Sequence, residues 1–315
     1  MIKRKPRLVE RWRLESQVRG LTKFIASKEQ QDASLNLGTT TIEKLLARKP
    51  SKFREVMGYS SGSLTTTGMW QATAGVLPAF SATGPKEANW RQVRLGLIQL
   101  AAAAWLRHSW VLREKCWDKE STATSMFDFL EPHTLCHAIA TGDDVFAHRF
   151  GRHLLANFRL TKGGDRIFFY SFDFLPFAFK LYCTWIGEEI TFRDDVANPL
   201  GWYQQIFDAW HEPQQLRSAL LDICDYHCQQ ALDQDVSAQF GYHPYNIFPV
   251  EIMALLRIRK ELGLPTPDFE HKLITGNPLL HPPATLPDVQ DDLLDRLVAY
   301  VRDAFPDVSP PWWLP

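Results

Sequence analysis

Histidines and carboxylates gather between residues 133 and 148, in a pattern that a metal-dependent hydrolase can use. His133 and His137 are four residues apart, so on a helix they share one face, as zinc ligands can. Asp143, Asp144 and His148 follow closely. The other interpretation is a set of hydrogen-bonded residues in a helical hairpin. The sequence favours it, because no HExxH pattern occurs and the two aspartates stand where a helix needs a cap.

A second group, Cys224, His227 and Cys228, lies within one expected helix. A structural zinc site normally draws its remaining ligands from a second cluster, and the sequence offers no partner cluster. Both cysteines also fall on an apolar stripe, where a free thiol packs like a small apolar group. We therefore expect core packing here. The five cysteines are few and odd in number, so we expect reduced thiols throughout.

Acidic side chains form a further candidate group in a short link between helices: Glu188, Glu189, Asp194 and Asp195. Paired carboxylates can act as acid and base, but more often they form a solvated face. A charged patch can also steer a partner of opposite charge. On that third interpretation these four residues, together with Asp143 and Asp144, are candidate contacts for a basic partner protein.

Tyr242, His243 and Tyr245 precede another expected helix. An exposed cluster of Tyr and His is typical of a binding hot spot. The same residues can equally form a capped turn, with Asn246 as the polar residue nearest the helix start. Both interpretations stay open, and the first adds these three residues to the candidate partner contacts.

Charge is distributed unevenly along the chain. Residues 1–60 hold fourteen Lys and Arg against six Asp and Glu, which leaves 21 basic and 30 acidic residues in the remainder. An acidic body favours encounter with basic partners, although the two parts can also simply complement each other. The net charge of −1 and the lack of a recognisable binding fold in the basic arm disfavour a nucleic-acid partner.

Helices must position these residues. Apolar side chains recur at helical spacing over residues 6–30, 41–47, 86–115, 132–140, 145–158, 181–185, 201–210, 213–232, 249–262 and 288–305. Many links between them are short, which favours antiparallel neighbours. In one such link Gly142 can take a left-handed turn, and Asp143 or Asp144 can cap the next helix.

Two stretches do not fit this pattern. Residues 58–85 are rich in Gly, Ser and Thr, so we expect a long loop or partly extended segment there. Residues 166–179 are rich in aromatic side chains, and within them 167–171 can be a short strand or part of an aromatic helix.

The helix at 249–262 has the clearest boundaries. Pro249 suits the first helical position, and Gly263 followed by Pro265 suits its end. We expect one apolar stripe toward the core, made of Phe248, Ile252, Leu255, Leu256 and Leu262. The charged residues are expected mostly outside it, namely Glu251, Arg257, Arg259, Lys260 and Glu261.

The sequence therefore predicts an all-α protein, with antiparallel helical hairpins in a bundle or α-solenoid-like array and at most a short strand. Residues 1–85 are expected as a basic arm and loop packed on a helical domain of residues 86–315. No uninterrupted apolar run of about 18 residues occurs, so we expect no membrane span. The charged N-terminus lacks an apolar segment of the kind that secretory signals have, so we expect a cytoplasmic protein.

Several segments follow one another in a suggestive order between residues 88 and 300: LGLIQLAAAAWL (95–106), HTLCHAIATGDDVFAHRFGRHLL (133–155), FAFKLYCTWIGEEI (177–190), YQQIFDAW (203–210) and PVEIMALLRIRKELGL (249–264). This order of a small-residue helix, a Gly-Asp hairpin, Trp-bearing helices and a final Arg-x-x-x-Gly helix resembles the helical immunity proteins of bacterial polymorphic-toxin and type VI secretion systems. The immunity protein 49 family is the nearest resemblance.

The resemblance implies a protein that binds one cognate toxin and blocks its active site or the approach of its substrate. It implies no cofactor and no catalytic turnover, so the expectation is that the chain is not an enzyme. A metal-dependent hydrolase built on His133, His137, Asp143, Asp144 and His148 remains the alternative.

Overall fold

The computed structural model describes all residues except 1–5, 82–85, 115–125, 165–168, 233–237 and 314–315. The described residues contain helices and no strand, which confirms the all-α prediction. The helices are α1 (Pro6–Arg11), α2 (Leu14–Ala26), α3 (Lys28–Gln31), α4 (Gly38–Arg48), α5 (Phe53–Val76), α6 (Trp90–Arg113), α7 (Leu130–Thr141), α8 (Asp144–Leu160), α9 (Phe174–Ile186), α10 (Gln204–Asp208), α11 (Pro213–Leu232), α12 (Val250–Glu261) and α13 (Asp292–Ala304).

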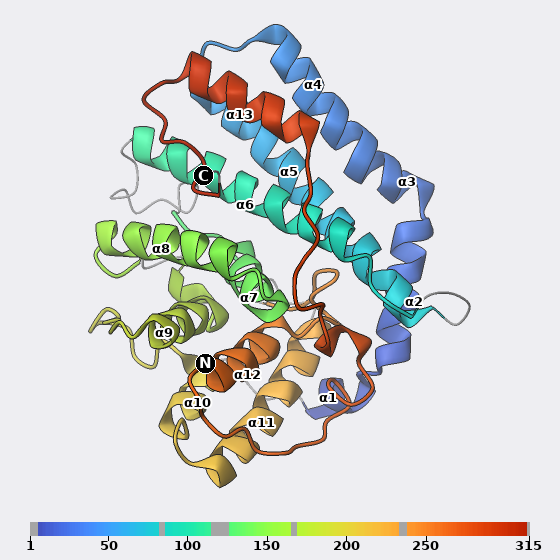
Figure 1. Cartoon of the computed structure of the whole chain (residues 1–315), viewed down its shortest axis with the longest axis vertical. Helices are drawn as coiled ribbons and strands as arrows, with labels where there is room; N and C mark the ends of the chain where they lie inside the picture. Colours follow the sequence, from blue (N-terminus) through green and yellow to red (C-terminus); the bar gives the residue numbers. More distant parts are fainter. Residues whose placement is uncertain (1–5, 82–85, 115–125, 165–168, 233–237, 314–315) are drawn as a thin grey trace.

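The helices lie in tiers about α6, which crosses the middle of the molecule (Figure 1). On one side of it are α4, α5 and α13, and α5 packs along α6. On the other side α7 and α8 form the expected hairpin, and α9 to α12 follow beneath it. The C-terminal segment returns to α6 and α8, where Trp312 stacks on Phe150 and Trp313 meets Trp105 edge to face.

Two apolar cores lie in this arrangement. The larger runs from the N-terminal helices through α6 to α9 and on to α11 and α12, and Trp12 and Leu21 are completely buried in it. The smaller is formed by α4, α5, α6 and α13, with Phe53 and Phe305 in edge-to-face contact. Residues from the first 85 positions therefore contribute to both cores.

The expected loop at 58–85 is wrong, because these residues continue α5 to Val76 and a 3₁₀ turn, Leu77–Phe80. Residues 82–85 of that expectation lie outside the described residues. Glycine serves close packing here: a Cβ on Gly96 would lie 2.5 Å from the carbonyl oxygen of Gly68 and 2.6 Å from the Ala72 nitrogen. Ser and Thr hydroxyls donate to carbonyls one turn back, as Thr73 does to Met69. Helix packing thus overrides the composition.

The aromatic stretch at 166–179 forms no strand where it is described. Phe169–Ser171 is a 3₁₀ turn rather than a strand, and α9 begins at Phe174. Part of the expected strand, residues 167 and 168, lies outside the described residues. The ring of Phe169 lies 5.1 Å from that of Phe158 on α8, so this turn closes the core between α8 and α9.

Helix α12 ends as predicted, since Gly263 has a φ of 68°. The predicted division of its side chains into buried apolar and exposed charged residues is wrong in both directions. Glu251 and Arg259 are buried, whereas Leu262 is 41% exposed. The reason is that α12 contacts α7, α9 and α11, so little of its circumference faces solvent. Pro249 precedes the first turn instead of occupying it.

None of the helices in the described part of the chain is long and apolar enough to cross a membrane.

Candidate functional site

His133 and His137 share one face of α7, as the spacing predicts, but that face points into the core. Rings of Phe174 and Tyr245 lie 4.8 and 4.4 Å from the His133 ring, and the Phe248 ring lies 5.0 Å from His137. Burial lowers the pKa of both histidines to about 3. At neutral pH they are therefore uncharged aromatic core residues.

The carboxylates expected beside these histidines form ion pairs with arginines instead. Asp143 pairs with Arg94 of α6 at 3.0 Å, and Asp144 pairs with Arg257 of α12 at 2.9 Å. Asp143 occupies the N-cap position of α8 but makes no side-chain capping hydrogen bond, so the predicted cap is wrong. His148 stacks on Trp185. In the described residues no group of three or more His, Cys, Asp or Glu side chains is placed to hold a metal ion.

Cys224, His227 and Cys228 pack in the core, as predicted. The two thiols are buried and free, and burial raises the pKa of each. His227 Nδ1 lies 2.7 Å from the Glu251 carboxylate, so the histidine ties α11 to α12. Cys136 and Cys183 are also free and buried, and Cys116 lies outside the described residues.

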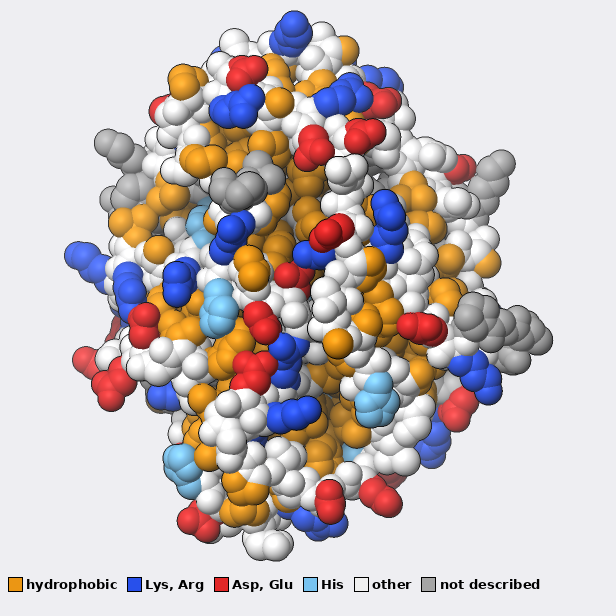
Figure 2. All heavy atoms as spheres, in the orientation of Figure 1, with side chains coloured by type: hydrophobic (Ala, Val, Ile, Leu, Met, Phe, Trp, Pro, Cys, Tyr) orange, Lys and Arg blue, Asp and Glu red, His pale blue; other side chains and the backbone are white. Residues whose placement is uncertain are grey.

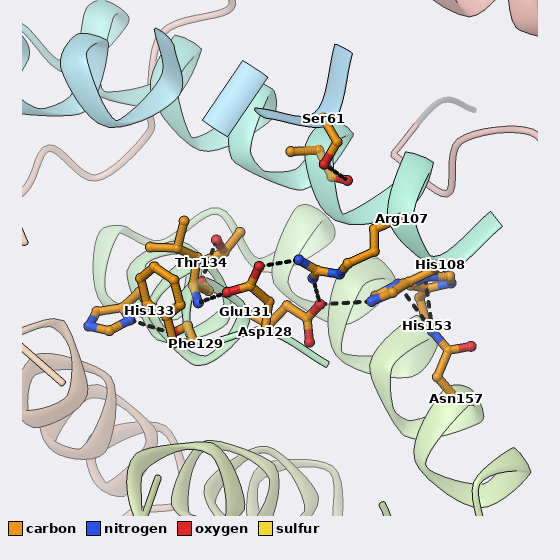
Figure 3. A network of polar contacts seen from close by, with 12 residues as sticks. Ser61, Arg107, His108, Asp128, Phe129, Glu131, His133, Thr134, His153 and Asn157 are labelled. Carbon is orange, nitrogen blue, oxygen red and sulfur yellow. Dashed lines mark hydrogen bonds and ion pairs between the residues drawn. The ribbon is translucent and has the colours of Figure 1, made fainter. Parts of the chain in front are cut away.

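A buried polar network that the sequence analysis did not single out joins α6, α7 and α8 (Figure 3). Arg107 donates to Asp128 and Glu131, and His108 Nε2 lies 2.7 Å from Glu131. His108 Nδ1 in turn lies 2.7 Å from His153 Nε2. These residues are scattered over 47 positions, so no local spacing marks them as one group.

Burial sets the charge states within this network. It raises the pKa of Glu131 to about 8 and lowers that of His153 to about 3. Asp128, whose side chain is 29% exposed, is the other ion-pair partner of Arg107. Trp312 stacks over His153 and covers the outer end of the chain of contacts. The network can hold a shared proton and can fix the junction of three helices.

One motif in the chain has the spacing of a nucleophile elbow, Gly58-Tyr-Ser-Ser-Gly62. Such a motif needs a sharp turn from strand to helix that exposes the serine hydroxyl. Here the five residues lie inside α5, and Ser60 is buried. The geometry does not support a catalytic serine at this position.

The helix-end surface is the most organised group of exposed and half-buried side chains. We define it as Asp144, Val145, His148, Trp185, Arg257, Glu261 and Leu262, at the start of α8 and the ends of α9 and α12. Arg257 joins Asp144 to Glu261, with Nε 2.7 Å from the Glu261 carboxylate. Trp185 Nε1 donates to Glu261 at 2.8 Å, and its ring stacks on His148 at 4.1 Å. His148 lies one turn after Asp144 on α8, so the helix itself closes these contacts into a ring.

This ring fixes the Trp185 indole, and two exposed apolar side chains adjoin its members in sequence. Val145 is 65% exposed and Leu262 is 41% exposed, and each follows a member of the ring in the chain. On the face drawn in Figure 2, acidic and basic side chains alternate over α8 and α12 with apolar side chains between them. Partial burial raises the pKa of Asp144, against the opposing effect of Arg257.

Gly142 makes room for Arg257 in this surface. It ends α7 with a φ of 79°, as predicted, and a Cβ there would lie 2.3 Å from the Arg257 guanidinium. The left-handed turn and the close approach both require glycine. The Gly-Asp turn thus positions Arg257 as well as the hairpin.

The acids of the 188–195 link follow α9 in the chain. Glu188 pairs with Arg159 at 2.5 Å, and Asp195 pairs with Arg193 at 3.0 Å. Glu189 and Asp194 line an open depression of about 420 Å³ whose floor includes Phe158 and Phe192. Glu188 stands three residues after Trp185 in sequence, and its partner Arg159 lies near the end of α8.

The Tyr242–Tyr245 turn is less exposed than predicted. Tyr245 is completely buried beside His133, so it is corrected from contact residue to core residue. His243 packs on Phe24 of α2 and is hydrogen-bonded to Asn246. Tyr242 alone is well exposed, at 45%, with its ring stacked on Phe129. The turn mainly joins the N-terminal helices to α7.

No protein-family model, curated protein or solved structure matches this chain.

Proposed function

We propose that the protein is an immunity protein, which binds a cognate bacterial toxin through the helix-end surface. The toxin belongs, on this proposal, to a polymorphic-toxin or type VI secretion system. Binding takes place in the cytoplasm and protects the producing cell and its kin.

The observation that carries the proposal is the origin of the helix-end surface. Asp144, Val145 and His148 come from the segment 133–155, Trp185 from 177–190, and Arg257, Glu261 and Leu262 from 249–264. These are three of the segments on which the resemblance to immunity proteins rests. Stretches up to 120 residues apart in sequence thus meet at one exposed site.

The chemistry of this surface suits a protein partner. Interface hot spots are enriched in Trp and Arg held within a rim of other side chains. Trp185 is held by a ring stack and a hydrogen bond, and Arg257 by two carboxylates. Because both side chains are already ordered, binding costs less conformational entropy. The acidic excess of residues 61–315 favours a basic toxin.

The test is co-expression with the product of each neighbouring gene, with rescue of growth and co-purification as the readouts. Against a toxin that the wild type binds, Trp185→Ala is expected to weaken affinity about thirtyfold, the effect of losing a hot spot worth ~2 kcal/mol. Tyr59→Ala removes an exposed aromatic ring from α5 instead and is expected to leave toxin affinity unchanged.

One result would contradict the proposed interface, and another would contradict the immunity function. Unchanged affinity in folded Trp185→Ala would remove the helix-end surface as the interface. Absence of any neighbouring product that is toxic and neutralised by this chain would remove the immunity function itself.

A further inference from the structure

A separate cavity of about 190 Å³ opens between α4 and the start of α5. The two helices pack side by side at the edge of the molecule (Figure 1). Leu45 and Pro50, both buried, belong to its lining. Its rim includes Lys44 and Arg48 from α4 and Glu55 and Tyr59 from α5. The volume is below that of a site for a drug-sized molecule and suits a compound with one ring.

The α4 wall carries two exposed cations that face the same space. Lys44 and Arg48 are four residues apart, so they lie on one helix face. Neither has an ion pair or side-chain hydrogen bond to another residue in the described part of the chain. Like charges at this spacing disfavour each other, so an anion between them stabilises both.

The α5 wall has a different chemistry. Tyr59 is 52% exposed and presents an aromatic ring, and Glu55 stands one turn before it. A carboxylate on this wall repels a second negative charge. The two walls of the cavity therefore differ in charge. The α4 wall is positive, and the α5 wall has an aromatic ring beside one negative charge.

We propose that this cavity binds a small organic anion that carries one ring. Its carboxylate or phosphate head lies between Lys44 and Arg48, and its ring lies against Tyr59 and Leu45. Arg48 can hold either head through two parallel N–H groups. The positive excess of residues 1–60 strengthens the attraction at low salt. This site is independent of the proposed toxin interface.

Ligand-observed fluorine NMR on the full chain tests the proposal with three probes: 4-fluorobenzoate, 4-fluorophenyl phosphate and the neutral 4-fluorobenzyl alcohol. Line broadening by the protein is expected for one or both anions and not for the alcohol. Binding of the benzoate alone identifies a carboxylic acid as the ligand class, and binding of the phenyl phosphate alone identifies a phosphomonoester.

Variants assign the binding to this cavity. The double change Lys44→Gln with Arg48→Gln is expected to weaken anion binding about tenfold or more. Glu55→Gln is expected to strengthen it, because the opposing charge is removed. Tyr59→Ala is expected to weaken binding of the ring-bearing probes. It is expected to leave unchanged the affinity for inorganic phosphate, measured by its competition with a probe.

Matched controls are Lys52→Gln and Glu43→Gln, which alter exposed charges outside the cavity lining and are expected to change nothing beyond a small salt-dependent effect. Circular dichroism confirms the fold of each variant. Equal binding of the neutral alcohol, or unchanged anion binding in both the double variant and Glu55→Gln, would overturn the proposal. No toxin is used, so this result stands apart from the test of immunity.

Discussion

Ionisable side chains in the interior define this protein at the scale of single residues. Glu131, Glu251 and Arg259 are each at most 1% exposed, and each meets a partner from another element. Glu251 meets His227, and Arg259 donates to the Trp210 carbonyl at 2.6 Å. Such partners lie tens of residues away, so helical periodicity alone assigns these charges to the surface. Their burial was not predictable from the sequence.

Glu131→Gln tests the protonation of the buried network. Burial holds the Glu131 pKa at about 8, above its unfolded value of about 4.3. The folded protein therefore keeps a proton that the unfolded chain releases, and this contribution to stability is lost as pH rises through about 8. We expect the free energy of unfolding to fall between pH 6.5 and 9 in the wild type and to fall less in Glu131→Gln.

At pH 7 Glu131→Gln is expected to lower the free energy of unfolding by less than about 1 kcal/mol, because an amide resembles the protonated carboxyl. Asp128→Asn is the contrasting variant, since it removes the ion pair with Arg107, and we expect the free energy of unfolding to fall by about 1.5–3 kcal/mol. Urea unfolding monitored by Trp fluorescence measures both. A loss of several kcal/mol in Glu131→Gln at pH 7 would mean that Glu131 is ionised there.

Gly142→Ala is predicted to disturb the helix-end surface. The positive φ disfavours alanine by about 1–2 kcal/mol, and the added methyl group also meets the Arg257 guanidinium. Gly187→Ala is the matched control, because Gly187 has a φ of 69° and no atom lies within 4 Å of the position that its methyl group would take. We expect Gly142→Ala to be the more destabilising of the two in urea unfolding. Equal losses would show that Arg257 moves aside freely.

At the scale of elements, the α5–α6 pair depends on glycine for its close approach. A Cβ on Gly96 would meet backbone atoms of Gly68 and Ala72 at 2.5 and 2.6 Å. Gly96→Ala is therefore expected to destabilise the protein by about 1–3 kcal/mol through overpacking. Gly62→Ala, in an exposed position of α5 with nothing within 4 Å, is expected to stabilise it by about 0.5–1 kcal/mol. Thermal unfolding compares the two, and stabilisation by Gly96→Ala would contradict this packing.

The same contact explains which elements can be predicted from the sequence. The α7–α8 hairpin and α11 are predictable because apolar spacing and a Gly turn signal them locally. Helix α5 resembles a loop in sequence because Gly68 and Gly75 lower its intrinsic helix propensity. These two glycines stabilise the helix only when α6 packs against them. The sequence of α5 alone does not show that α6 packs there.

At the scale of the whole molecule, the expected partner contacts overlap the helix-end surface at one residue. Asp144 belongs to both sets, and its role in binding stays a prediction. Trp185, Arg257 and Glu261 were not expected there, although they complete the ring. Their meeting depends on how α8, α9 and α12 converge. Local patterns indicate helices well but do not specify that convergence.

The acid stability of the molecule follows from its buried histidines. Burial holds the pKa of His133, His137 and His153 at about 3, whereas unfolded histidine titrates near 6.5. Between these values the unfolded chain binds protons that the folded protein does not. Stability is therefore present above pH 6.5 and is lost as pH falls, by up to about 1.4 kcal/mol per pH unit for each histidine. The raised pKa of Glu131 opposes this trend, whereas the lowered pKa of His108 adds to it.

We therefore expect the urea midpoint to fall steeply between pH 6.5 and 4.5. His137→Phe keeps an aromatic ring beside Phe248 and removes one titrating group, so its curve is expected to be shallower than that of the wild type over this range. His211→Asn, at an exposed position, is the control and is expected to leave the slope unchanged. If His137→Phe and the wild type lose stability at the same rate, His137 is accessible to protons in the folded state, and its neutral role in the core is wrong.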